Sequence, residues 1–171
     1  LRTSNGEVLG ELIGEPGELL ELSFSADGNF LLSDTYFRRE YQSILWDLHT
    51  SQARLSFPQN YRVDQVTFSP DGSHLAACNP EENQVKILDL SSLEPVVEFK
   101  VYDCSNTTYS PDGKILAVTS GTIIRLHQAQ DGAYLDALSG ERVQFAPSGN
   151  YLLTTTNREI TTYIPNKNYA N

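Results

Sequence analysis

The chain has 171 residues, of which 39% are hydrophobic and 20% charged, a composition that suits a folded domain with a sizeable core and excludes a disordered chain. No apolar stretch approaches the roughly 20 residues that a membrane helix needs, so we expect no membrane contact. Twelve basic residues against 22 acidic ones give a net charge of −10, which repels a phosphate backbone and argues against nucleic acid as a partner.

Four segments share one pattern, in which an alternating apolar run leads through a turn into a second apolar run. In chain order they read LSFSADGNFLLS at 22–33, VTFSPDGSHLAA at 66–77, TTYSPDGKILAV at 107–118 and VQFAPSGNYLLT at 143–154. The glycines of the four turns stand about 40 residues apart, which is the period of a repeated supersecondary unit.

The Ser-Pro-Asp-Gly turn predicts a hairpin connector, because Pro presets φ, Asp bonds to nearby backbone and Gly accepts a positive φ. The residues that we assign to these turns are Asp27, Gly28, Asp71, Gly72, Asp112, Gly113 and Gly149. Their carboxylates occur singly, without the DxDxD spacing of a calcium loop. We therefore expect turn residues here, and neither a metal nor another cofactor in the protein.

A third apolar run follows each hairpin, at 43–47, 85–89, 123–127 and 160–164, and a fourth follows three of them, at 53–57, 95–101 and 133–138. The runs are short, rich in β-branched and aromatic residues, and without helical periodicity. They predict an all-β fold built from antiparallel four-stranded meanders. Four such meanders in a row are typical of the blades of a β-propeller.

The FSPDG turns, followed in the first unit by Leu45-Trp46-Asp47, resemble the WD-repeat (WD40-type) β-propeller family over nearly the whole chain. The resemblance implies a buried hydrogen-bond network of His, Ser, Trp and Asp. The family's Gly-His reads Gly14-Glu15 and Gly140-Glu141 in this chain, so the network is incomplete. Ser33 and Trp46 are its remaining members, Asp47 is assigned a structural role, and we expect the blades to depend on apolar packing.

With the strands of a blade labelled a to d from the axis outward, the runs predict four WD-like blades in one propeller region, 1–171. Blade 1 is expected at about 19–57, blade 2 at about 62–101, blade 3 at about 103–138 and blade 4 at about 142–164. Residues 7–13 align with the d runs, while the last unit stops after strand c. By resemblance to closed WD-repeat rings, we expect the strand at 7–13 to complete blade 4.

Three assemblies are open: a fragment of a longer propeller, a half-ring that pairs with a second copy, and a closed four-blade ring. We favour the fragment, because the chain lacks Met and begins at Leu1 in the middle of a repeat. Open ends would expose unpaired strand edges and apolar blade faces. We therefore expect the isolated chain to associate, for example as a homodimer.

Cys78 and Cys104 are too few for a disulfide framework, and their spacing fits no zinc or redox motif. We expect two small, buried, apolar side chains, which together with the acidic charge favour a cytoplasmic protein. The sequon Asn106-Thr107-Thr108 falls inside a predicted strand, so no glycan is assigned to it.

The sequence contains no nucleophile elbow, P-loop, GxGxxG or HExxH motif. His49 lies in a c-to-d connection, His74 at the start of a b strand and His127 near the end of a c strand. We interpret them as surface or structural residues and not as metal ligands. No catalytic residue is assigned, and we do not expect an enzyme.

One face of the predicted propeller carries the d-to-a and b-to-c loops, because successive strands alternate in direction. On it we predict a long b-to-c loop at 34–41 in blade 1, rich in aromatic and arginine residues, which is the composition of binding hot spots. The partner-binding candidates on this face are Tyr36, Phe37, Arg38, Arg39, Tyr41, Tyr61, Arg62 and Tyr102. The patch suits an acidic or aromatic peptide. Aromatic rings that cover the blade, beside arginines in surface ion pairs, explain the same composition equally well.

We expect a non-catalytic interaction scaffold that binds a protein or peptide partner on this face. The alternative is an accessory or regulatory propeller of a larger enzyme, such as a peptidase or signalling ATPase, with its catalytic domain outside this chain. A third hypothesis is a small-ligand site in the axial channel, formed by Asp64, Gln65, Asp103, Ser105, Asn106 and Gln144. A water-filled channel is the simpler interpretation of those polar residues.

Overall fold

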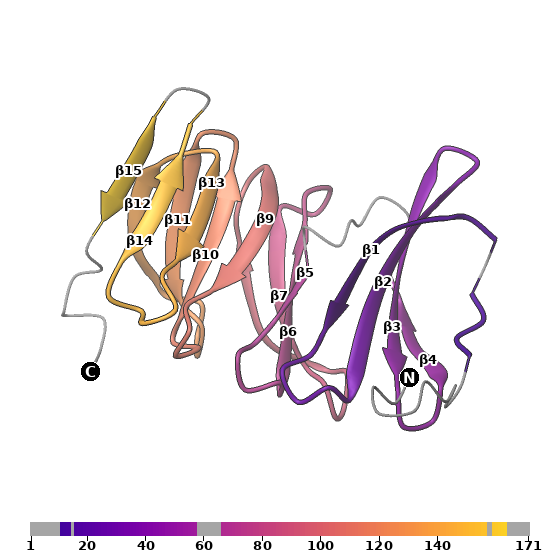
Figure 1. Ribbon diagram of the computed structural model, residues 1–171. Helices are drawn as coiled ribbons and strands as arrows, with labels where there is room; N and C mark the ends of the chain where they lie inside the picture. Colours follow the sequence, from indigo (N-terminus) through magenta and orange to yellow (C-terminus); the bar gives the residue numbers. More distant parts are fainter. Residues whose placement is uncertain (1–10, 15, 58–65, 157–158, 164–171) are drawn as a thin grey trace. The chain divides into compact units, whose positions relative to one another are not determined.

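The computed structural model describes residues 11–14, 16–57, 66–156 and 159–163 of the chain (Figure 1). Within these residues every regular element is a β-strand, and the strands form four antiparallel sheets. The all-β fold with consecutive blades is therefore the one that the sequence predicted. The chain divides into two units, residues 1–63 (unit 1) and residues 64–171 (unit 2).

Unit 1 holds a single sheet, blade 1, in which each strand pairs with the next along the chain. Its strands are β1 (Glu18–Phe24), β2 (Phe30–Phe37), β3 (Glu40–Asp47) and β4 (Gln52–Ser56). Leu31, Ile44 and Trp46 form its buried cluster. The Trp46 indole Nε1 donates a buried hydrogen bond to Ser33 Oγ at 2.8 Å, so the two residues singled out by the resemblance are joined across β2 and β3.

Unit 2 holds three sheets. Blade 2 consists of β5 (Val66–Phe68), β6 (His74–Asn79), β7 (Gln84–Asp89) and β8 (Pro95–Lys100). Blade 3 consists of β9 (Cys104–Tyr109), β10 (Ile115–Ser120), β11 (Ile123–Gln128) and β12 (Tyr134–Ser139). The last sheet, blade 4, has the described strands β13 (Arg142–Phe145), β14 (Leu152–Thr155) and β15 (Ile160–Tyr163). Of the strand expected to complete it, residues 7–10 lie outside the described residues, and Glu11–Ile13 form no strand.

The apolar core of unit 2 lies between successive sheets. One cluster joins blades 2 and 3 and includes Val85, Ile87 and Leu116, and a second joins blades 3 and 4 through Ile124 and Phe145. Blade 3 thus buries its two faces against blades 2 and 4, as stacked repeats do.

The turns between the first and second strands of blades 1 to 3 share one hydrogen-bond pattern. The turn serine donates from Oγ to the aspartate Oδ1 two residues on, at 2.6, 2.5 and 2.6 Å. The same Oγ accepts the backbone N–H five residues on, at 2.9 Å in each blade. The turn glycines have φ between 71° and 73°, a region that costs other residues about 1–2 kcal/mol. The serines, whose role the sequence analysis did not assign, are Ser25, Ser69 and Ser110.

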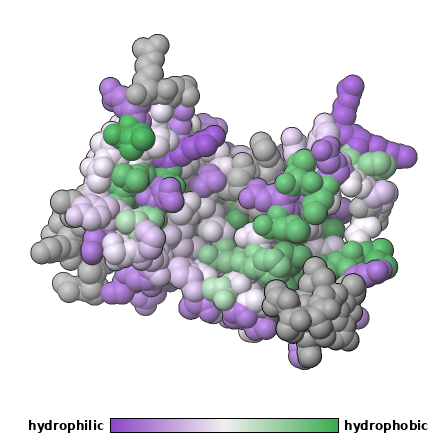
Figure 2. Space-filling view, viewed as in Figure 1, coloured by the Kyte–Doolittle hydropathy of each residue, from purple (hydrophilic) through white to green (hydrophobic). Residues whose placement is uncertain are grey.

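Strand β1 of blade 1 leaves large apolar side chains exposed, and apolar surface gathers on this part of the molecule (Figure 2). The exposed side chains on it are Leu19, Leu20, Leu22 and Phe24. In stacked repeats a neighbouring repeat covers such a surface. Association of the chain with a second copy stays a prediction.

Cys78 and Cys104 form a disulfide, so the expectation of two separate thiols is wrong, although both side chains are buried as expected. The bond joins β6 of blade 2 to β9 of blade 3, and the two Cα atoms lie 6.0 Å apart, an ordinary separation for a disulfide. Propeller geometry places the second strand of one blade beside the first strand of the next. This adjacency of β6 and β9 brings together two cysteines that are 26 residues apart in the sequence.

Removal of the disulfide should destabilise unit 2 by about 3 kcal/mol, because the bond closes a loop in the unfolded chain. The check is urea unfolding of the Cys78→Ala/Cys104→Ala variant beside the wild-type chain with and without reductant. Reductant should lower the wild-type midpoint and leave the variant unchanged. Equal midpoints for the oxidised wild type and the variant would contradict this account.

Loss of the Ser33 hydroxyl should destabilise blade 1 by about 1–3 kcal/mol, because it leaves the buried Trp46 N–H without its acceptor. The measurement is the free energy of unfolding of Ser33→Ala. In a Trp46→Phe background, which has no indole N–H, the same substitution should cost clearly less. An equal cost in both backgrounds would show that the hydrogen bond is not the cause.

Candidate partner-binding site

Residues 34–41 of blade 1 do not form the predicted long loop. Strands β2 and β3 continue through this segment, with Tyr36 opposite Tyr41 and Phe37 opposite Glu40. Only Arg38 and Arg39 remain as a two-residue turn, and both have positive φ, 52° and 73°. This is the sign pattern of a type I′ hairpin turn, whose twist matches that of the flanking strands. The predicted loop is wrong because cross-strand pairing of the aromatic residues extends the hairpin.

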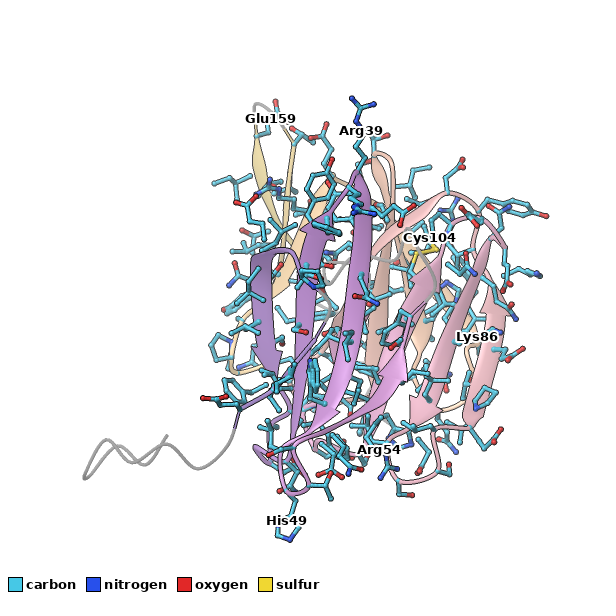
Figure 3. All side chains as sticks on the ribbon, turned by 90° about the vertical axis from the view of Figure 1, so that its right-hand side faces the viewer. Arg39, His49, Arg54, Lys86, Cys104 and Glu159 are labelled. Atoms are coloured by element: carbon cyan, nitrogen blue, oxygen red, sulfur yellow. A yellow bond between two sulfur atoms is a disulfide. The ribbon has the colours of Figure 1, made fainter. Side chains whose placement is uncertain are left out.

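Five of the partner-binding candidates lie together at the end of this hairpin. We call this group the hairpin tip: Tyr36, Phe37, Arg38, Arg39 and Tyr41. The Tyr36 and Tyr41 rings pack with centroids 4.9 Å apart. The Arg38 guanidinium carbon lies 5.0 Å from the centroid of the Phe37 ring, within the range of a cation–π contact. Tyr36 is 36% exposed and Phe37 43% exposed. Arg39 projects from the tip, at the opposite end of the blade from His49 (Figure 3).

Both turn positions hold a residue type that the backbone conformation disfavours. Non-glycine residues with positive φ cost about 1–2 kcal/mol each, and hairpin turns of this type normally carry Asn-Gly or a related pair. Two arginines at these positions therefore reduce the stability of blade 1. Strain of this kind is concentrated at functional sites.

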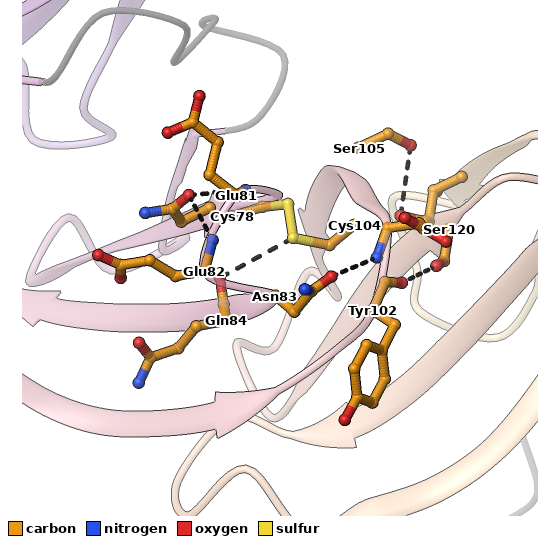
Figure 4. The surroundings of a disulfide bond; sticks show 12 residues. Cys78, Glu81, Glu82, Asn83, Gln84, Tyr102, Cys104, Ser105 and Ser120 are labelled. Atoms are coloured by element: carbon orange, nitrogen blue, oxygen red, sulfur yellow. Dashed lines mark hydrogen bonds between the residues drawn. A yellow bond between two sulfur atoms is a disulfide. The ribbon is translucent and has the colours of Figure 1, made fainter.

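Tyr102 lies in unit 2, in the turn between β8 and β9, and is 70% exposed. The turn is tied to blade 2: the Asp103 N–H donates to Asn83 Oδ1 at 3.1 Å, and the next residue, Cys104, forms the disulfide. The Tyr102 carbonyl also accepts a hydrogen bond from Ser120 Oγ. In Figure 4 the Tyr102 ring points away from this bonded base. Tyr61 and Arg62 lie outside the described residues.

The structure places the three histidines on separate elements. His49 is exposed after β3, His74 begins β6 and His127 is buried on β11. No group of three or more His, Cys, Asp or Glu side chains in the described residues is arranged to hold a metal ion. Nor does the described part of the chain contain a helix able to cross a membrane. Of the polar residues assigned to an axial channel, Ser105 and Asn106 lie on β9, Gln144 on β13, and Asp64 and Gln65 outside the described residues.

His127 is enclosed between blades 2 and 3. Its ring lies 4.4 Å from the Phe99 ring of β8 and 5.8 Å from the Tyr134 ring of β12, centroid to centroid. Nδ1 donates to the Gly132 carbonyl at 2.9 Å, and Nε2 has no hydrogen-bond partner among the described residues. Burial lowers the pKa of His127; the Gly132 hydrogen bond opposes that shift and the charge of Arg125 adds to it. The side chain is therefore a neutral core residue.

Comparison with known proteins places the chain among repeat proteins, although no protein-family model matches it. An uncharacterized WD repeat-containing protein of Synechocystis sp. is 25% identical over 109 residues, which cover 60% of this chain and 31% of that protein. The small ribosomal subunit protein RACK1 of Caenorhabditis elegans is 27% identical over 129 residues, or 68% of this chain and 38% of that protein. Both are WD-repeat proteins. The chain spans less than half the length of these relatives.

Among solved structures, a chain of Kuenenia stuttgartiensis hydrazine synthase matches with a TM-score of 0.65. The match covers 93% of this chain and 49% of that chain, at 20% sequence identity. At this identity the likeness concerns the fold alone, which is that of consecutive propeller blades.

The buried His127 should make the stability of the protein depend on pH. Because its pKa in the folded state lies below the ordinary value of about 6.5, the unfolded chain takes up the proton first as pH falls. The contribution of His127 is complete above pH ~6.5 and decreases as pH falls from there toward the folded pKa. Urea unfolding between pH 8 and 5 measures it.

In this titration His127→Phe should flatten the pH dependence, since the replaced ring cannot be protonated. His49→Gln, which removes an exposed histidine, should retain it. An unchanged slope in His127→Phe would assign the effect to another group.

Proposed function

We propose that the chain is a WD-repeat β-propeller and acts as a non-catalytic scaffold that holds a protein or peptide partner at the hairpin tip of blade 1. The observation that carries this proposal is the tip itself, where two arginines occupy strained turn positions among exposed aromatic rings. One relative is by name a protein of the small ribosomal subunit, which supports a role within a larger assembly.

The chemistry of the tip selects an acidic segment with aromatic residues. Arginine presents a planar fork of donors that matches a carboxylate, and the guanidinium also stacks on aromatic faces. Tyr36 and Phe37 offer rigid contact area at a low entropic cost. A basic tip on a chain with a net charge of −10 also favours approach of an acidic segment in this orientation over others.

The competing structural interpretation assigned the arginines to surface ion pairs. The ion pairs that the structure gives the described residues involve Arg54 and Lys86, and neither arginine of the tip. Arg38 lies over Phe37, and both arginines are exposed. This arrangement supports recognition by the tip over internal stabilisation.

The disulfide is evidence about the cellular compartment of such a scaffold. Cytosolic reductants keep most thiols reduced, so a disulfide in the core favours an oxidising compartment, or the interior of a hyperthermophile. The cytoplasmic location expected from the sequence stays a prediction. Alkylation of the protein taken from its native cells and unfolded without reductant would decide it: complete alkylation of Cys78 and Cys104 would support the reducing location.

The proposal is tested by replacing the turn with Asn-Gly, as Arg38→Asn/Arg39→Gly. Because Asn-Gly suits a type I′ turn, the melting temperature should stay the same or rise. Binding to an array of peptides rich in Glu, Asp and Tyr should weaken by about tenfold or more, since both cationic forks are lost. Fluorescence anisotropy of the best array peptide measures the change.

The matched control is Arg54→Gln, which removes a positive charge from β4 of the same blade. It should leave peptide binding unchanged. Undiminished binding by a folded Arg38→Asn/Arg39→Gly variant would refute the assignment of the site.

A further inference from the structure

A groove of about 860 Å³ lies between blades 2 and 3, at the end of the sheets that carries the turns between first and second strands. The turns of both blades line it, as do side chains of β7 and β8. The hairpin tip connects the second and third strands of a blade, and the Tyr102 turn connects the fourth strand of one blade to the first strand of the next. Because successive strands alternate in direction, both connections lie at the end of a blade opposite to the turns between first and second strands. The groove is therefore a separate feature from the proposed scaffold site.

Tyr109, at the end of β9, lines this groove, and its hydroxyl is the polar group of interest. Its side chain is 8% exposed, and its hydroxyl is buried without a hydrogen-bond partner among the described residues. A buried hydroxyl left in this state costs about 1–3 kcal/mol. Burial, and after it the negative charge of Asp71, raises the pKa of Tyr109, so the hydroxyl stays protonated and its oxygen can accept a donor.

Asp71 and Asp112 line the same groove, each with an oxygen that its turn does not use. Every hydrogen bond that the structure gives these two carboxylates ends on Oδ1. In the equivalent turn of blade 1, Asn29 Nδ2 donates to Oδ2 of Asp27 at 2.7 Å. Blades 2 and 3 have Ser73 and Lys114 in place of Asn29, so this bond is absent there.

Both carboxylates are ionised at neutral pH. Hydrogen bonds from Ser69 and Ser73 lower the pKa of Asp71 to about 2. For Asp112, burial raises the pKa, but hydrogen bonds from Ser110 and the Lys114 backbone and the charge of Lys114 outweigh it. Lys114 and His74 also line the groove, and the charge of Lys114 offsets part of the charge of Asp112.

We propose that the groove binds an arginine side chain carried by an extended segment of a partner protein. Residues that line the groove carry three oxygen acceptors, Oδ2 of Asp71, Oδ2 of Asp112 and the hydroxyl of Tyr109, and a guanidinium has five N–H donors and no acceptor. Ile87 and Val97 provide an apolar wall for the aliphatic part of the side chain. The volume exceeds that of one side chain, so neighbouring residues of the segment fit as well.

Arginine fits this site better than lysine for two physical reasons. Its donors form a fixed planar fork that can reach separate oxygens at once, whereas an ammonium group is a compact point charge. A guanidinium is also more weakly hydrated, so its transfer into a partly apolar groove costs less.

The test is an NMR titration of the full 15N-labelled chain with N-acetyl-arginine methylamide. Saturable shift changes at Tyr109 and in the two turns of Asp71 and Asp112 are the expected result. N-acetyl-citrulline methylamide, which has nearly the same shape and no charge, should produce none. Equal saturation by citrulline, or shift changes confined to other residues, would overturn the proposal.

Two variants assign the effect to the groove. Asp71→Asn/Asp112→Asn keeps the turn acceptors, removes both charges and should weaken binding by about tenfold or more. The matched control Asp27→Asn changes the same turn in blade 1 and should bind normally. Undiminished binding by the double variant would refute the site.

Tyr109→Phe separates recognition from stability. Because no residue in the described part of the chain hydrogen-bonds to the hydroxyl, the melting temperature should not fall, while arginine binding should weaken severalfold. A lower melting temperature with unchanged binding would show that the hydroxyl has a structural role. Arg38→Asn/Arg39→Gly should leave this titration unchanged, so failure of either proposal is separate from failure of the other.

Discussion

The turn between the first and second strands of each blade is the local interaction on which the rest of the structure depends. One serine hydroxyl donates to the aspartate and accepts a returning N–H, and so sets the register of the hairpin. That register directs Leu116 into the buried layer between blades 2 and 3. Blade 4 has Ala146 and Ser148 in the corresponding positions. Its turn keeps the two backbone bonds, from the Gly149 N–H to the Ala146 carbonyl and from the Ala146 N–H to the Tyr151 carbonyl, but has no serine hydroxyl to join them.

Blades 2 and 3 are held together differently at their two ends. At one end the disulfide and the Asn83 hydrogen bond tie the Tyr102 turn to the preceding blade. At the other end, the two aspartate turns border a groove in which the Tyr109 hydroxyl has no hydrogen-bond partner among the described residues. The first end has the rigidity that suits a structural joint, and the second has unsatisfied polar groups that a ligand can complete.

The candidate sites differ in how far local sequence could predict them. Aromatic and arginine composition identified the hairpin tip, but a loop was expected where pairing of Tyr36 with Tyr41 continues the strands. Composition gave no signal for the groove, since Asp71 and Asp112 were identifiable only as turn residues. Their unused oxygens become meaningful only beside Tyr109, which the packing of β9 against blade 2 provides.

From the sequence alone, alternation of apolar residues, turn chemistry and a repeat of about 40 residues determined the all-β blades. The resemblance to WD-repeat proteins implied the pair Ser33 and Trp46. These are short-range properties, readable within one strand or one hairpin. The tertiary structure alone decided that Cys78 meets Cys104, that His127 is enclosed by Phe99 and Tyr134, and that two turns form a groove. The disulfide, the surroundings of His127 and the groove all depend on contacts between different strands or different blades. The order of residues along the chain does not specify which faces of two blades pack together.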